Sequence, residues 1–245
     1  PIIVAGTGST SESAPDRTTP TPIISAQAVT RVFGLGETAV TAVNNITLDV
    51  LPGEFLAVVG RSGSGKTTLL NIMSGLDRPT TGSVFFLGQD LATMSDADLV
   101  ELRRHKVGFV FQSFGLMPLL SAVENVELPL HIRGTSWRQR HQLALETLEL
   151  VGLGPRARHR PYELSGGEQQ RVSIARALVT GPDVVFADEP TGELDTTTAM
   201  SITAILQDIA AHRGTTVIVA THDLTLADMC TRTESLQDGA LVPSA

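Results

Sequence analysis

Residues 55–75 read FLAVVGRSGSGKTTLLNIMSG, and their pattern is the strongest indication of the fold class. It opens with a short apolar run that ends in glycine, the pattern of a strand buried on both faces of a sheet. A glycine-rich turn follows, and a helical segment with leucine and isoleucine comes directly after it. A buried strand, a glycine-rich turn and a helix in this order predict a nucleotide-binding α/β domain.

The glycine-rich turn fits the pattern G-x-x-x-x-G-K-[ST]. Its glycines let successive backbone N–H groups point at phosphate oxygens, and the following helix adds about half a positive charge at its N-terminus. Lys66 is expected to reach the β- and γ-phosphates, and the Thr67 hydroxyl is expected to hold Mg²⁺. The alternative is a plain glycine-rich turn. The sequence thus predicts ATP and Mg²⁺ as cofactors, with these nucleotide-binding residues: Gly60, Arg61, Ser62, Gly63, Ser64, Gly65, Lys66, Thr67 and Thr68.

Similar buried runs recur along the chain, at VGFVFQ (107–112), DVVFADE (183–189) and TTVIVATH (215–222). Helical segments separate them, and buried strands that alternate with helices predict an α/β domain with a mainly parallel sheet. Residues 28–33 and 46–50 instead alternate apolar and polar side chains, which is typical of half-buried antiparallel strands. We expect one domain over residues 23–245, with an N-terminal antiparallel β subdomain and a helical subdomain inserted at about 91–164.

Composition narrows the possible partners. Residues 1–22 are rich in Ser, Thr, Gly and Pro and are expected to form a flexible tail. The net charge of −8 argues against nucleic acid as a partner. No apolar run approaches the roughly 18 residues that a membrane span needs, so a membrane role would act through another chain. The single cysteine, Cys230, excludes an intrachain disulfide and is interpreted as an inert, partly buried side chain.

Polar side chains stand where the buried strands end. Asp188 is placed to hold the metal, and Glu189 is placed to take a proton from the attacking water. A helix cap is the alternative for this carboxylate pair. His222 is predicted to sense the γ-phosphate, although a strand-terminal histidine can also be a cap, and Gln112 is predicted to contact both Mg²⁺ and the lytic water. Because the carboxyl ends of parallel strands share one edge, all four are expected to meet.

A second glycine pair lies in ELSGGEQQR, residues 163–171. It is typical of a helix N-terminus that is open to an anion. One nucleotide cannot easily use both this helix and the first phosphate loop. We therefore expect a head-to-tail dimer, in which Ser165, Gly166 and Gly167 of one copy face the γ-phosphate of ATP held by the other.

These motifs, in this order and spacing, resemble the ATPase subunit of ABC transporters. The resemblance covers nearly everything from residue 23 to 242 and adds Glu168 to the signature residues. It implies a dimer with ATP between the two copies, with Asp195 of GELD (192–195) contacting the opposite subunit. It also implies that Phe33 stacks on adenine, the alternative being a plain strand residue. Many relatives have Asn where this chain has Glu193, which could alter communication between the two sites.

The segments at residues 109–130 and 164–195 resemble those of one branch of this family, the branch that serves lipoprotein release, macrolide export and bacterial cell division. This resemblance implies a separate integral membrane permease with a large extracytoplasmic domain, and a peripheral location on the cytoplasmic face of the bacterial inner membrane. The apolar residues Phe114, Leu116, Met117 and Pro118 would form a wall of the permease groove, or else pack locally. Two other functions stay open: a soluble ABC-type ATPase acting on DNA or ribosomes, and a nucleotide-gated scaffold with little turnover.

Overall fold

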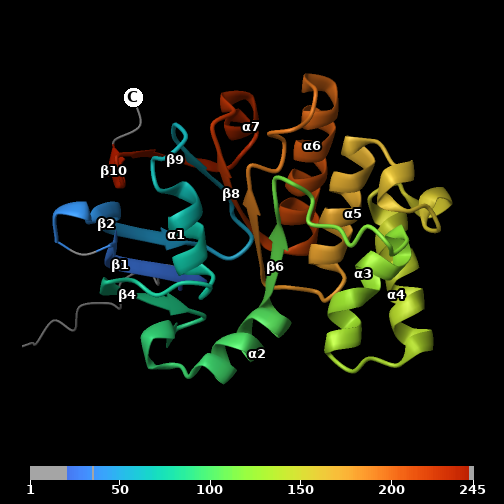
Figure 1. Cartoon of the computed structure of the whole chain (residues 1–245), viewed down its shortest axis with the longest axis horizontal. Coiled ribbons are helices and arrows are strands. Elements are labelled where there is room, and N and C mark those ends of the chain that lie inside the picture. The colour runs from blue at the N-terminus through green and yellow to red at the C-terminus, as the bar shows by residue number, and fades with distance from the viewer. Residues whose placement is uncertain (1–20, 35, 243–245) are drawn as a thin grey trace, which may run out of the picture.

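Two sheets form the framework of the computed structural model, which describes residues 21–34 and 36–242. The predicted tail, residues 1–22, lies outside this range except for its last two residues. In Figure 1 the smaller sheet lies at one end of the molecule and a pair of helices, α3 and α4, lies at the other. The smaller sheet has the order β2-β1-β4-β5 and the larger β10-β9-β3-β8-β7-β6.

The strands are β1 (Ile24–Phe33), β2 (Val40–Val50), β3 (Phe55–Val59), β4 (Thr81–Phe86), β5 (Gln89–Asp90), β6 (Val107–Val110), β7 (Val184–Asp188), β8 (Thr216–Thr221), β9 (Arg232–Gln237) and β10 (Ala240–Val242). The helices are α1 (Lys66–Met73), α2 (Asp96–Lys106), α3 (Ala122–Ile132), α4 (Trp137–Leu150), α5 (Gly166–Leu178), α6 (Thr196–Arg213) and α7 (Leu224–Asp228). Short 3₁₀ turns lie at Gly36–Thr38, Leu91–Thr93, Gly154–Arg156 and Pro161–Glu163.

The larger sheet is parallel from β9 through β6, and only β10 runs antiparallel at its edge. The smaller sheet is antiparallel throughout. Both results confirm the predicted α/β class with its N-terminal antiparallel sheet.

Side chains of the larger sheet alternate between two hydrophobic cores. Val185 and Val217 belong to the core shared with α3, α4, α5 and α6. Their neighbours Phe186 and Ile218 belong to the core shared with α1 and the smaller sheet. Successive residues of a strand point to opposite faces, so a strand covered on both faces needs an unbroken apolar run. This explains why the sequence of these strands shows no polar alternation.

The helical region differs in extent from the predicted insertion at 91–164. Strand β6 lies inside that range but pairs with β7 in the larger sheet. Helix α2 also lies inside it, yet Leu99 and Leu102 join the core of the smaller sheet. Helices α3 and α4 pack mainly on each other and on α5, and α5 in turn contacts β6 and α6. The spacing of apolar residues in a helix predicts which side chains share a face. It does not predict which of the two cores that face packs against, so the position of α2 was not predicted.

Helix α6 has a capping residue at each end. The Asp195 side chain accepts a hydrogen bond from the backbone N–H of Thr198 at its start, and Gly214 adopts φ 66° directly after its last residue. Within residues 21–34 and 36–242, no helix is both long and apolar enough to span a membrane.

Candidate nucleotide-binding site

Four adjacent parallel strands bring the predicted site residues to one edge of the larger sheet. In the order β3-β8-β7-β6, these strands end next to the phosphate loop, His222, the carboxylates of Asp188 and Glu189, and Gln112. Side-chain hydrogen bonds and charged contacts link one cluster, which consists of Lys66, Thr67, Asp188, Glu189 and His222. Their proximity is the geometry expected from the sequence, and their individual roles remain proposals.

The phosphate loop runs from Gly60 to the first turn of α1. Gly65 adopts φ 104°, and a Cβ atom at this position would lie 2.1 Å from the carbonyl oxygen of Ala42, so only glycine fits. The hydroxyl oxygen of Ser64 is buried and has no hydrogen-bond partner among the described residues. A buried polar atom without a partner is costly unless a ligand supplies one. The loop therefore suits an anion such as phosphate, whose oxygens accept hydrogen bonds from donors of the loop.

Lys66 holds the cluster together by charge. Its side chain is only 6% exposed, and its ammonium group donates hydrogen bonds to the carbonyls of Gly60, at 2.8 Å, and Arg61, at 3.1 Å. The ammonium also lies 3.4 Å from the carboxylate of Glu189. A buried ammonium is tolerated only with such partners. Phosphate oxygens would offer it the same kind of acceptor.

Thr67 and Asp188 form a pair suited to a hard cation. The Thr67 hydroxyl donates a hydrogen bond of 2.8 Å to Oδ2 of Asp188. The other oxygen, Oδ1, is buried and has no partner among the described residues. Burial raises the pKa of Asp188, and the bond from Thr67 opposes this rise. Mg²⁺ typically takes one or two carboxylates and completes its shell with water and phosphate oxygens, so these two side chains fit it.

Glu189 lies between Lys66 and His222 in an unusual backbone conformation. Its φ is 46°, a region that non-glycine residues rarely occupy. One carboxylate oxygen faces Lys66, and the other lies 2.9 Å from Nδ1 of His222. Strained backbone that persists at such a position is typical of functional sites. The arrangement holds the carboxylate at the strand edge, where a general base is expected.

Gln112 comes two residues after the end of β6 and lies next to the turn that follows Glu189. A Cβ atom at Gly192 would be 3.2 Å from the Gln112 amide nitrogen. The N–H of Gly192 in turn donates to the carbonyl of Glu189, at 3.1 Å. Gln112 therefore contacts the segment that directly follows Glu189. Its predicted contact with the metal and the lytic water stays a prediction.

Phe33 ends β1 and is 42% exposed. The guanidinium of Arg31 lies 4.5 Å from the centre of its ring, a cation–π contact. Arg31 is also held by Asp77, at 2.9 Å. One face of the ring is thus covered by Arg31. Stacking of adenine on Phe33 stays a prediction.

The second glycine pair begins α5, as expected from its sequence. Ser165 and Glu168 form a reciprocal capping box, and the hydrogen bond from the Ser165 backbone holds the pKa of the Glu168 carboxyl below its usual value. Gly167 lies against the start of α6, because a Cβ atom there would be 2.3 Å from Cγ2 of Thr198. Thr198 is fixed by Asp195, which accepts a hydrogen bond of 2.6 Å from its hydroxyl. The signature residues and Asp195 therefore form one surface.

No role was predicted for Gln170, which is wholly buried in α5. Its amide donates hydrogen bonds to the carbonyls of Pro190, at 2.7 Å, and Phe111, at 3.4 Å. These are the segments that follow β7 and β6. The available signal was the helical spacing of Gln170 with Ile174 and Ala177, which puts a polar side chain on an apolar stripe of α5.

Comparisons with known proteins agree with this geometry. The family model "ABC transporter" matches residues 43–192. The lipoprotein-releasing system ATP-binding protein LolD of Geobacter metallireducens is 48% identical, over 87% of this chain and 95% of that protein. The macrolide export ATP-binding/permease protein MacB of Marinobacter nauticus is 47% identical over 91% of this chain. This chain spans only about a third of the length of such export proteins, since the match covers 34% of MacB.

Solved structures give the same result. The ATP-binding cassette MJ0796, in a dimeric post-hydrolysis state bound to ADP and Pi, is similar with a TM-score of 0.83 and 42% identity. The match covers 90% of this chain and 97% of that one.

The contact between Gly167 and Thr198 predicts a defined cost for an added methyl group. Gly167→Ala should lower the free energy of unfolding by about 1–3 kcal/mol, because the β-branched Thr198 cannot easily move aside. Thr198→Ser removes Cγ2 and keeps the hydroxyl that bonds Asp195, so the double variant should recover much of the loss. Urea unfolding of the four proteins without nucleotide measures this. An equal cost of Gly167→Ala in both backgrounds would contradict the contact.

Burial of Asp188 predicts a trade-off between stability and binding. Because its folded pKa is raised, ionisation of Asp188 disfavours the folded state once the pH exceeds the unfolded value of about 3.9. The penalty is complete above the folded pKa. Asp188→Asn should therefore stabilise the nucleotide-free protein at pH 7.5 and do so less at pH 4.5. Urea unfolding at both values tests this, with the exposed Asp228→Asn as control, and destabilisation at pH 7.5 would refute it.

Proposed function

The chain belongs to the ABC transporter ATPase family, and on this premise we propose that it hydrolyses ATP as a dimer and thereby drives a membrane permease. The observation that carries the proposal is the cluster of Lys66, Thr67, Asp188, Glu189 and His222 at one sheet edge. It combines a phosphate-binding cation, a metal-binding pair and a candidate base. Such a set suits phosphoryl transfer to water.

Each member of the cluster has a distinct task. Lys66 meets the charge of the β- and γ-phosphates, which compete with Glu189 for the ammonium. Thr67 and Asp188 would hold Mg²⁺, and the ion would supply positive charge next to the phosphates. Glu189 takes a proton from the attacking water, and His222 keeps its carboxylate oriented. Gln112 completes the site beside the metal and the water.

We propose that the second half of each site comes from a second copy. The N-terminus of α5, with Ser165 at its cap, faces the γ-phosphate of the ATP held by the other subunit. Asp195 adjoins this surface through Thr198 and contacts the partner at the same interface. The dimeric structures of MJ0796 support this assembly.

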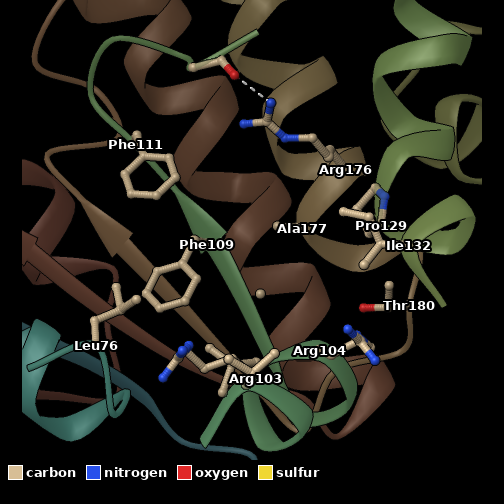
Figure 2. Close-up of a pocket in the computed structure, with 14 residues that line it drawn as sticks. Leu76, Arg103, Arg104, Phe109, Phe111, Pro129, Ile132, Arg176, Ala177 and Thr180 are labelled. Atoms are coloured by element: carbon tan, nitrogen blue, oxygen red, sulfur yellow. Dashed lines mark hydrogen bonds between the residues drawn. The ribbon is translucent and has the colours of Figure 1, made fainter. Parts of the chain in front are cut away.

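The permease contact is proposed for a groove between α2, β6, α3 and α5. The groove has a volume of about 470 Å³, and Figure 2 shows Phe109, Phe111 and Ile132 along it. Arg103, Arg104 and Arg176 also line the groove, and its lining includes no carboxylate although the chain carries a net charge of −8. A short cytoplasmic segment with apolar anchors and an acidic residue would complement it.

The predicted groove wall is only partly supported. Leu116 packs against the core, which favours local packing at that position. Met117 is 52% exposed, and Phe111 and Gly115 line the groove itself. We therefore place the docking surface on the groove and not on Leu116.

The names of the relatives support a transporter role over the other functions considered. Export and lipoprotein release favour a permease partner in the bacterial inner membrane, with this chain on its cytoplasmic face. We extend this to a permease with a large extracytoplasmic domain, as the branch resemblance implies. A soluble ATPase that acts on DNA or ribosomes is not favoured.

Replacing the candidate base tests the catalytic assignment. Glu189→Gln should retain ATP binding and lower kcat by about 10²–10⁴-fold, the usual contribution of a general base. It should also accumulate an ATP-bound dimer, visible by size-exclusion chromatography. Glu146→Gln, which changes an exposed glutamate of α4, serves as control and should turn over normally. Normal turnover by Glu189→Gln would remove Glu189 from the role of base.

A pair of surface variants tests the docking groove. Ile132→Asp places a charge in the groove and should abolish co-purification with the permease, while basal ATP hydrolysis persists. Trp137→Asp, at a position of similar exposure outside the groove, should keep the permease. The measurement is affinity purification from detergent-solubilised membranes, with the membrane protein identified by mass spectrometry. Normal recovery with Ile132→Asp would move the docking surface elsewhere.

A further inference from the structure

Arg176 of α5 forms hydrogen bonds to the turn that follows Gln112, which contains Phe114 and Gly115. Its guanidinium donates hydrogen bonds to the carbonyl oxygens of Gly115, at 2.5 Å, and Phe114, at 3.0 Å. Figure 2 shows the side chain reaching from α5 toward this turn, with the bond drawn as a dashed line. A planar guanidinium can serve two neighbouring acceptors in one geometry, which a lysine cannot.

The backbone conformation of this turn needs stabilising contacts from other parts of the chain. Phe114 has φ 58° and Gly115 has φ 59°, so two successive residues are left-handed and one of them carries a bulky side chain. Such a backbone persists only where the surroundings fix it. Gln170, also on α5, holds the carbonyl of Phe111 before the turn, and Asn125 holds Met117 after it. Arg176 is the side chain that bonds the two left-handed residues themselves.

The chemistry of Arg176 suits this task better than a charge–charge role. Burial lowers the pKa of its guanidinium, and the two groups that accept its hydrogen bonds are backbone carbonyls. A buried guanidinium without hydrogen bonds would be costly, so the two carbonyls fix its position as firmly as it fixes theirs. The turn after Gln112 and the last turn of α5 are thereby joined into one unit.

This unit connects three parts of the molecule. Helix α5 begins at the signature residues, the turn carries Gln112, and Arg176 itself lines the docking groove. We propose that Arg176 is a positioning residue that holds the turn so that the Gln112 amide is correctly placed for the metal and the water. This inference rests on the proposed function, because it acts through the role assigned to Gln112.

Arg133 provides a matched control. It is another partly buried arginine, its pKa is lowered mainly by burial, and its guanidinium also donates to carbonyls, those of Arg104 and Thr180. These carbonyls belong to residues at the other end of the same groove. A general effect of losing a buried guanidinium should therefore appear in both variants, and an effect on the turn should appear in one.

The test compares Arg176→Lys, Arg133→Lys and Gln112→Ala. Hydrogen exchange of amides 111–116 in the protein without nucleotide or metal should become roughly tenfold faster in Arg176→Lys, the effect of losing about one hydrogen bond, and stay unchanged in Arg133→Lys. In turnover, Arg176→Lys and Gln112→Ala should both lower kcat and raise the Mg²⁺ concentration for half-maximal activity. Their effects should not add in the double variant.

Two outcomes would overturn the inference, and they are distinguishable. If Gln112→Ala leaves kcat and the Mg²⁺ dependence unchanged, the role proposed for Gln112 is wrong and the inference falls with it. If Gln112→Ala changes them while Arg176→Lys changes neither them nor the exchange of the turn, the proposed function stands and the positioning role is wrong.

Discussion

The parallel pairing of β3, β8, β7 and β6 is the constraint on which the rest of the structure depends. Because these strands are adjacent and point the same way, their last residues must share one edge. Each strand is covered on both faces, so its sequence is apolar until that edge and polar just beyond it. The site is therefore built from side chains that are far apart in the chain, such as Lys66 and Glu189. The order and direction of the strands are enough to bring them together.

Helix α5 is the second shared element. Its N-terminus carries the signature residues, its buried face carries Gln170, and its later turns carry Arg176. Gln170 and Arg176 hold the segments after β6 and β7 by hydrogen bonds to backbone carbonyls, which depend on position and not on the identity of the residues held. A small movement of α5 would therefore be felt at Gln112 and at the groove together, the kind of coupling that a packed, two-state element can carry.

Local patterns predicted the parts of the molecule that local physics determines. The phosphate loop needs its glycines at fixed spacing, and buried strands need continuous apolar runs, so residues 55–75 and the polar strand ends could be interpreted directly. Contacts between distant segments left no such pattern. The inward packing of Leu116 and the contact of Gly167 with Thr198 depend on where α5 and α6 meet. The core that receives α2 likewise follows from the fold of the whole chain.

The ion pair between Lys66 and Glu189 has one further consequence. Before any nucleotide arrives, the buried ammonium already has an anionic neighbour at 3.4 Å. Under the function proposed above, entry of ATP would exchange one anion for another around Lys66, and the Glu189 carboxylate would lose one of its two partners when the phosphates bind. On that proposal, the contact that binds the phosphates and the contact that holds the candidate base share a single ammonium group, so nucleotide binding and activation of the base would be coupled.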